Sequence, residues 1–225
     1  MKFKFLNKAL TGLVFSAGCL VSVANAGIIY SNDFESGSTA AQFTVSNSVV
    51  TAPNGESYIG PLNKGETPTL SLDNLATHSS ITIDFDIYGL RSLDGTTNQD
   101  YFQFFIDGSS QFIDFYGHSN GQIVGPTTGQ LVSHESTAFG HGYFYGGAST
   151  YHYSITYTHV ASSINFGFKA STDQSWSDEA FGLDNVVVSD NRTLSAATSV
   201  PEPSTLAIFA LAIMGFASRK FKKQS

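Results

Sequence analysis

The chain has 225 residues, of which 41% are hydrophobic and 13% charged, and its formal net charge is −7. Seven of the 11 basic residues lie within the first 26 and the last 26 positions. Residues 27–200 therefore hold four basic and 17 acidic side chains, a formal net charge of −13. So acidic a segment argues against nucleic acid as a partner, because the phosphate backbone would repel it. The excess of carboxylates can serve solubility alone, or it can suit a protein that works outside the cell, where calcium is abundant.

Residues 1–26 have the order of a secretory signal peptide. Three lysines precede an apolar run, which ends in Ala24-Asn25-Ala26. This order predicts export and cleavage by signal peptidase between Ala26 and Gly27. Lipoprotein processing at Cys19 is an alternative for the same segment. Because Cys19 is the only cysteine, the mature domain is predicted to contain no disulfide.

Residues 27–190 show the two-residue period of β-strands. Dipeptides typical of turns, such as Asp107-Gly108, separate the strands. The pattern predicts an all-β fold in which two antiparallel sheets form a β-sandwich of jelly-roll or lectin-like type, because many short strands need a second sheet to cover their apolar face. Apolar and polar side chains alternate most clearly over residues 80–90, 101–106, 151–157 and 163–168.

Several stretches of this domain resemble a known fold. The segments 32–35, 75–88, 91–95 and 175–188 are similar to a concanavalin-like β-sandwich of secreted bacterial proteins. The resemblance implies that the first and last strands pair in one sheet. It also implies that the acidic residues near Glu35 and Asp184 hold a structural calcium ion. The sequence itself offers Asp33 or Asp178 as a further ligand. Since calcium needs six to eight oxygen ligands, the alternative is that Asp184-Asn185 caps a turn before the strand at 186–188.

A glycine-rich and tyrosine-rich stretch follows in the second half of the domain. Glycines let a loop expose aromatic rings, and such rings suit the faces and hydroxyl groups of sugars. The alternative is a tyrosine-rich strand whose rings fill the sandwich core. The candidate ligand contacts are Tyr143, Tyr145, Tyr151 and Tyr153.

The C-terminal part begins with a polar linker at residues 191–199, and residues 200–225 follow with a distinct order. Pro201-Glu202-Pro203 comes first, and it predicts an exposed elbow because proline can continue neither a helix nor a strand ladder. The apolar run after it predicts a short transmembrane helix at about residues 205–218. By the positive-inside rule, the chain end stays cytoplasmic. The basic cluster that stops the helix is Arg219, Lys220, Lys222 and Lys223.

The segment from Val200 to Lys223 resembles the PEP-CTERM sorting signal of Gram-negative bacteria. The resemblance implies that an exosortase cuts near Pro201, Glu202 and Pro203, so that the protein stays in the inner membrane transiently and then reaches the cell surface or the extracellular matrix. Two alternatives remain for the same residues: a permanent C-terminal anchor, or a hydrophobic helix of the globular domain.

Catalytic motifs are weak in this sequence. It contains no Gly-x-Ser-x-Gly elbow, no His-Glu-x-x-His and no phosphate-binding glycine loop. We therefore expect a non-enzymatic surface or exopolysaccharide-associated protein with a structural or adhesive role. The alternatives are a carbohydrate-binding module and, third, a polysaccharide-cleaving enzyme. Apart from the possible calcium ion, no cofactor is expected.

Overall fold

The computed structural model describes residues 27–45, 48–96, 98–117, 125, 127–135 and 147–192. The predicted signal peptide, the Pro-Glu-Pro elbow, the hydrophobic run and the basic cluster lie outside these residues. Within the described part every regular element is a β-strand. None of the described segments forms a helix with the length and apolarity that crossing a membrane requires.

Twelve strands make up the described fold. The first begins at Gly27 and the last ends at Asp190. They are β1 (Gly27–Asn32), β2 (Phe43–Thr44), β3 (Val49–Thr51), β4 (Ser57–Leu62), β5 (Thr69–Asp73), β6 (Ser80–Arg91), β7 (Tyr101–Ile106), β8 (Ser109–Phe115), β9 (Gln130–Glu135), β10 (Ala148–Thr158), β11 (Ser163–Ser171) and β12 (Glu179–Asp190).

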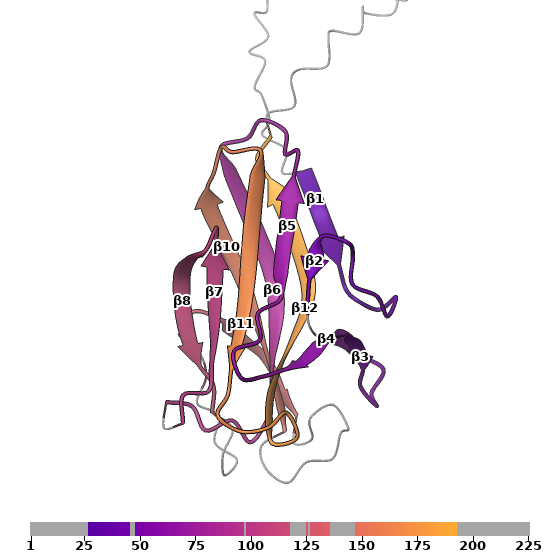
Figure 1. Cartoon of the computed structure of the whole chain (residues 1–225), viewed down its shortest axis with the longest axis vertical. Helices are drawn as coiled ribbons and strands as arrows, with labels where there is room; N and C mark the ends of the chain where they lie inside the picture. Colours follow the sequence, from indigo (N-terminus) through magenta and orange to yellow (C-terminus); the bar gives the residue numbers. More distant parts are fainter. Residues whose placement is uncertain are drawn as a thin grey trace, which may run out of the picture. The chain divides into compact units, whose positions relative to one another are not determined.

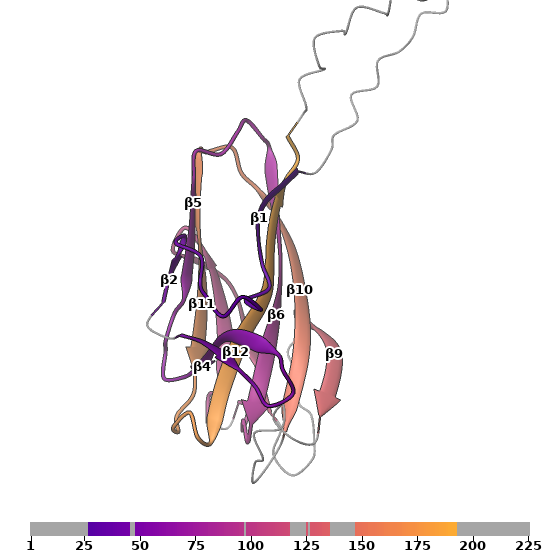
Figure 2. The same cartoon turned by 90° about the vertical axis from the view of Figure 1, so that its right-hand side faces the viewer.

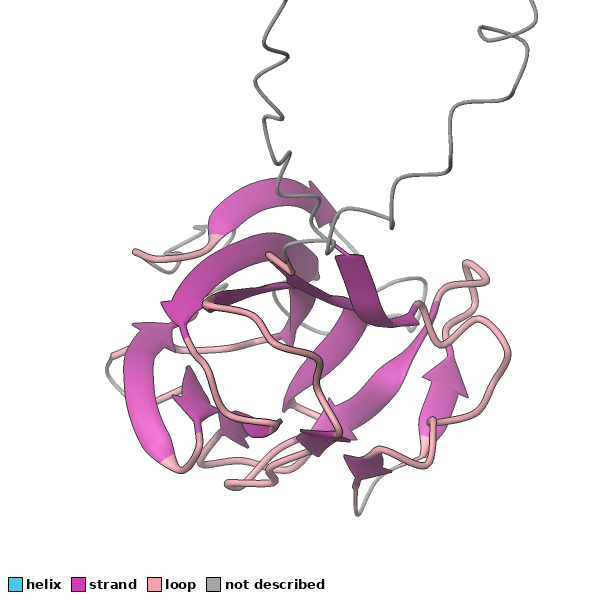
Figure 3. Ribbon diagram, turned by 90° about the horizontal axis from the view of Figure 1, so that it is seen from above, coloured by secondary structure: helices cyan, strands magenta, loops and turns pink. Residues whose placement is uncertain are grey.

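The strands form two antiparallel sheets, as the sequence predicts. The larger sheet has seven strands in the order β3-β4-β12-β6-β10-β9, with β1 paired to β12 off this path. The smaller sheet has five strands in the order β2-β5-β11-β7-β8. Figure 1 shows the smaller sheet in front of the larger one, and the side view in Figure 2 separates the two layers. Seen from above in Figure 3, both sheets curve around a shared interior. The predicted two-sheet β-sandwich is therefore confirmed.

Strand β6 shows why the alternating pattern produces this sandwich. Ile83, Phe85 and Ile87 are at most 1% exposed and face the second sheet, whereas the residues between them are only partly buried. Successive side chains of a strand point to opposite faces, so one face enters the core and the other remains polar. The outer face of β6 carries Asp84 and Asp86.

Aromatic rings from both sheets meet at Phe85 in the centre of the core. The Phe85 ring stacks on Tyr153 from the same sheet, with centroids 5.0 Å apart and planes 7° apart. Across the interface its centroid lies 5.1 Å from that of Phe104 and 5.2 Å from that of Phe168. These rings come from β7 and β11 of the smaller sheet. Such contacts join the two layers through apolar burial and aromatic packing.

The first and last strands pair in the larger sheet, as the concanavalin-like resemblance implies. The register of β1 on β12 runs from Gly27 opposite Asp190 to Asn32 opposite Val186. Strand β12 also pairs with β6, and its register shifts between Asp184 and Val187. This β-bulge inserts one extra residue into β12 and changes the direction of the side chains beside it.

A buried carboxylate connects strand β8 to the segment before β9. Asp114 is 1% exposed, and its side chain accepts hydrogen bonds from the backbone amides of Thr127, Thr128 and Gly129 at 3.2 to 3.3 Å. It also accepts a hydrogen bond from the Tyr153 hydroxyl at 3.0 Å. One side chain thereby holds the backbone of residues 127–129 against the end of β8 and gives the buried Tyr153 hydroxyl an acceptor beside the Tyr116 hydroxyl.

Candidate functional site

A polar pocket of about 220 Å³ lies on the outer face of the larger sheet. It spans the turn between β3 and β4 and the neighbouring strands β12, β6, β10 and β9. Amide, carboxyl and hydroxyl groups dominate its lining, which offers both hydrogen-bond donors and acceptors. The lining residues are Asn54, Glu56, Asp86, Tyr88, Ser133, Thr150 and Asn185.

The bulge in β12 brings Asn185 to this pocket. Asn185 has a positive φ of 51°, a backbone conformation that asparagine tolerates better than most residues. Its Nδ2 donates to Asp86 Oδ2 at 2.9 Å. Without the bulge, the next residue of a regular strand would point into the core. The local irregularity therefore places an amide group beside the pocket.

Asp184 lies below the pocket and is held by two short hydrogen bonds. The Tyr88 hydroxyl donates to Asp184 Oδ2 at 2.5 Å, and the backbone N–H of Asn185 donates to Asp184 Oδ1 at 2.6 Å. Burial raises the pKa of Asp184 to about 7, and the neighbouring charges of Glu56 and Asp86 add to the rise. Burial and the hydrogen bond to Asp184 raise the pKa of Tyr88 well above its ordinary value. Tyr88 therefore remains a neutral donor.

Asp86 is fixed in the pocket from a second side. His152 Nδ1 lies 2.8 Å from Asp86 Oδ1, while Asn185 occupies Oδ2. The Asp86 side chain is 16% exposed and the His152 side chain 42% exposed, so both can reach solvent. Glu56 completes the acidic character of the pocket, and it accepts a weaker hydrogen bond from Tyr88 at 3.3 Å. The orientation of these groups is thus set before any ligand enters.

Each of the residues predicted to bind calcium accepts a hydrogen bond from a different group. Asp184 is buried beside the pocket, whereas Glu35 is exposed and accepts a hydrogen bond from the Ser57 amide at 2.9 Å. Asp33 caps its own turn by accepting from the Glu35 amide at 3.3 Å, and Asp178 accepts from the Ser92 hydroxyl at 2.7 Å. The carboxylates that influence Asp184 are Glu56 and Asp86. A calcium ion shared by Glu35 and Asp184 stays a prediction.

The predicted aromatic ligand contacts divide into two pairs. Tyr143 and Tyr145 lie outside the described residues. Tyr151 and Tyr153 are 3% and 1% exposed, respectively, and belong to the core. Their rings are covered by the second sheet, so the prediction of ligand contact needs correction at these two positions. Both side chains fill the sandwich core, as the alternative interpretation of the tyrosine-rich strand predicts.

Sequence reasoning missed most of the pocket. Its residues come from separate strands, and no motif in the chain joins Glu56, Asp86 and Asn185. The one available signal was the pair of acidic residues, Asp84 and Asp86, on the polar face of β6. That signal indicated an exposed face without showing which neighbouring strands would complete it.

Comparison with protein families identifies the C-terminal segment. Residues 199–223 match the PEP-CTERM protein-sorting motif. The motif implies a protein that is exported, passes a membrane and is processed by an exosortase, in agreement with the interpretation of Pro201-Glu202-Pro203 and the basic end. A search of curated proteins found no match.

Solved structures resemble the β-sandwich at low sequence identity. The exo-β-1,3-galactanase of Phanerochaete chrysosporium is 14% identical with a TM-score of 0.36, over 70% of this chain and 28% of the galactanase chain. The mannan-recognising carbohydrate-binding module TmCBM27 is 10% identical with a TM-score of 0.40, over 74% of this chain and 99% of the module. A CBM35 from Cellvibrio japonicus Abf62 is 13% identical with a TM-score of 0.33, over 74% and 88%, respectively. These similarities concern the fold alone.

Proposed function

We propose that this protein is a non-enzymatic β-sandwich delivered to the cell surface or the extracellular matrix of a Gram-negative bacterium, where it has a structural or adhesive role. The match of residues 199–223 to the PEP-CTERM protein-sorting motif carries the proposal. The apolar run would hold the protein in the inner membrane while an exosortase cuts near Glu202. The β-sandwich would then be released or attached outside.

Replacing Pro201, Glu202 and Pro203 together by alanine is expected to abolish processing. The wild-type protein should be found outside the inner membrane without its basic end, and the triple variant should remain in the membrane fraction with Ser225 intact. C-terminal mass spectrometry of the membrane, surface and medium fractions measures both outcomes.

Two controls accompany this processing experiment. Pro53→Ala changes an exposed proline in the turn between β3 and β4 and should be processed normally. A host without exosortase should reproduce the triple variant. If the wild-type chain ends at Ser225 in every fraction of a host that has the exosortase, the proposed sorting is wrong.

A second candidate function is the binding of a neutral glycan in the polar pocket. The pocket presents carboxylates from Glu56 and Asp86 together with amide and hydroxyl groups, which match the hydroxyl groups of a sugar. The two carboxylates disfavour an anionic polysaccharide. Asp184 is 1% exposed and both its oxygens accept hydrogen bonds, which favours binding over proton transfer to a ligand.

The double variant Glu56→Gln and Ser133→Ala is expected to weaken glycan binding at least tenfold. It removes one charged acceptor and one hydroxyl from opposite sides of the pocket, and a hydrogen bond to a charged group contributes about 1.5 to 3 kcal/mol. Calorimetric titration with neutral oligosaccharides cut from the host exopolysaccharide measures the affinity.

Asp73→Asn is the matched control, because Asp73 is exposed, lies at the end of β5 in the smaller sheet and is not among the pocket residues. It should bind the oligosaccharides like the wild type. Chromatography of the sugars after incubation tests for cleavage in the same samples. Glycan binding in this pocket is refuted if the wild type does not bind, or if the double variant binds equally well.

A further inference from the structure

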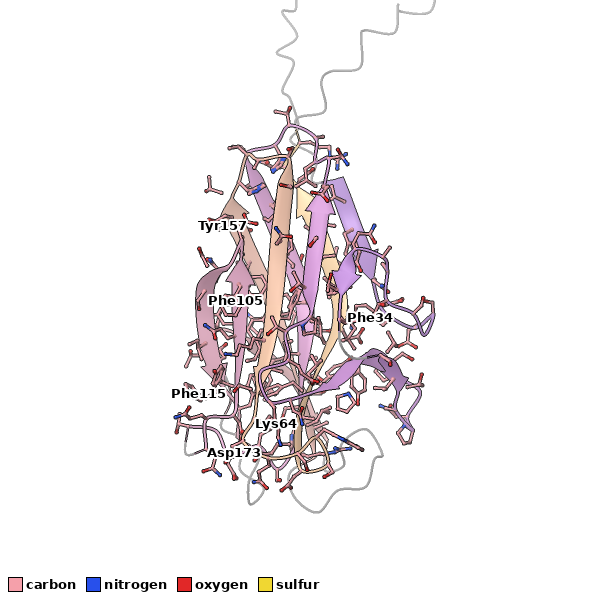
Figure 4. The ribbon with its side chains drawn as sticks, in the orientation of Figure 1. Phe34, Lys64, Phe105, Phe115, Tyr157 and Asp173 are labelled. Atoms are coloured by element: carbon pink, nitrogen blue, oxygen red, sulfur yellow. The ribbon has the colours of Figure 1, made fainter. Side chains whose placement is uncertain are left out.

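Three acidic side chains meet at one end of the sandwich, where the loop between β6 and β7 meets the loop between β11 and β12. Asp100, Asp173 and Glu179 each offer one carboxylate oxygen, and these oxygens all lie within 4.8 Å of one another. Figure 4 labels Asp173 at this end of the molecule. The group does not overlap the residues that line the polar pocket.

Asp100 is held rigidly at the centre of this acidic group. It is completely buried, its backbone amide donates to the Gly95 carbonyl at 2.9 Å, and its carbonyl accepts from the Tyr116 amide at 3.0 Å. Its Oδ2 accepts a hydrogen bond from the Asp94 amide at 2.5 Å. Its Oδ1 is also buried but accepts no hydrogen bond. A buried carboxylate oxygen without a donor is costly, and a cation would remove that cost.

Glu179 is the second buried member and begins strand β12. It is completely buried, and Gln174 donates to both of its oxygens, from the backbone amide at 3.1 Å and from Nε2 at 3.2 Å. Asp173, next to Gln174 in the chain, is exposed and leaves the group open to solvent. The arrangement therefore combines two oriented buried carboxylates with one solvent-accessible ligand.

The charges in the group oppose one another. Burial raises the pKa of both Asp100 and Glu179, and the charged neighbours that add to the rise are acidic, with Asp173 acting on both. At neutral pH in a calcium-containing exterior, a bound cation is the direct way to compensate several close carboxylates.

We propose that Asp100, Asp173 and Glu179 form a calcium-binding site. Two oxygens bound to one Ca²⁺ at about 2.4 Å can be at most about 4.8 Å apart, which the three carboxylates satisfy. The donors are all hard oxygen atoms, which favours calcium over zinc or copper. Bound calcium would join the two loops and hold the segment 172–178, including Trp176, against the end of the sandwich.

Trp176 provides a direct readout of this site. It is the only tryptophan in the chain and lies midway between Asp173 and Glu179. The residue is 55% exposed, and the Arg91 guanidinium carbon lies 5.4 Å from the centroid of the Trp176 ring. Titrating the EDTA-treated full chain in detergent with CaCl₂ should change Trp176 emission saturably, with a dissociation constant of about 0.1 to 1 mM. The melting temperature should rise in the same samples.

Asp173→Asn tests the site without disturbing a buried residue. It should weaken calcium binding at least tenfold and remove most of the calcium-induced rise in melting temperature. Asp73→Asn is the matched control, because Asp73 is an exposed aspartate at the end of β5, and it should respond like the wild type. Asp184→Asn tests whether the calcium ion binds near the polar pocket instead. If calcium binds at Asp100, Asp173 and Glu179, this variant should show the same calcium-induced change in Trp176 emission as the wild type.

Two results would overturn the calcium site. The first is a wild-type protein whose emission and melting temperature do not change up to 5 mM CaCl₂, a concentration of about ten times the middle of the expected range. In that case a proton shared by Asp100 and Glu179, rather than a calcium ion, compensates the close carboxylates. The second is an Asp173→Asn variant that binds calcium with wild-type affinity. A MgCl₂ titration run in parallel should give a weaker response, since Mg²⁺ dehydrates reluctantly.

Discussion

Asp114→Ala is expected to lower the free energy of unfolding by about 3 to 5 kcal/mol. The substitution removes the buried acceptor for the Tyr153 hydroxyl and for the amides of Thr127, Thr128 and Gly129. Several hydrogen bonds are lost together, and the buried Tyr153 hydroxyl keeps only its hydrogen bond with the Tyr116 hydroxyl. The effect also reaches the core, because Tyr153 stacks on Phe85.

Urea denaturation of the exported protein, followed by circular dichroism, measures this loss. Asp114→Asn keeps one acceptor oxygen and should cost less than the alanine substitution. Asp73→Ala is the control, since Asp73 is exposed, and should stay within about 0.5 kcal/mol of the wild type. A loss below about 1 kcal/mol for Asp114→Ala would show that the carboxylate does not hold the segment 127–129 in place.

Stability is also expected to fall as the pH rises from 5 to 8.5, by about 2 to 4 kcal/mol from Asp184. Burial raises the pKa of this carboxyl from 3.8 to about 7, so the folded protein binds more protons than the unfolded chain between these values. The contribution of Asp184 is complete below about pH 4 and is lost as the pH passes through 7. The folded protein must then hold a buried negative charge beside Glu56 and Asp86.

Asp184→Asn should remove this part of the pH dependence, because the amide does not ionise. Burial also raises the pKa of Asp100 and Glu179. These two groups add to the decrease of the unfolding free energy with pH, and they do so equally in the wild type and in the variant. The relevant quantity is the difference between the two unfolding curves in EDTA at pH 5 and pH 8.5. Equal slopes for the wild type and the variant would mean that Asp184 is ionised throughout that range.

Much of the fold could be predicted because strand periodicity is a local property. The alternation of Ile83, Phe85 and Ile87 with polar residues follows from the geometry of one strand, and it correctly indicated a sheet with one buried face. The same reasoning left Tyr151 and Tyr153 with two alternatives. An alternating tyrosine can face a ligand or the core, and only the position of the second sheet decided for the core.

The pocket could not be predicted, because it depends on which strands are neighbours. Asp86 and Asn185 meet only because β12 pairs with β6 and bulges after Asp184. A bulge leaves little trace in composition, since it is a matter of register between two distant segments. The acidic group of Asp100 and Glu179 arises in the same way, because the sandwich brings the loop before β7 and the start of β12 to one end.

The sequence by itself determined the targeting of this protein and its β character. The sorting signal depends on the order of a Pro-Glu-Pro triplet, an apolar run and a basic cluster along the chain. The β character depends on the two-residue alternation within each strand. Both features can be recognised from the sequence without a structure. The tertiary structure alone decided which polar side chains converge. Their positions depend on strand order, register and burial, which arise only when distant segments pack together.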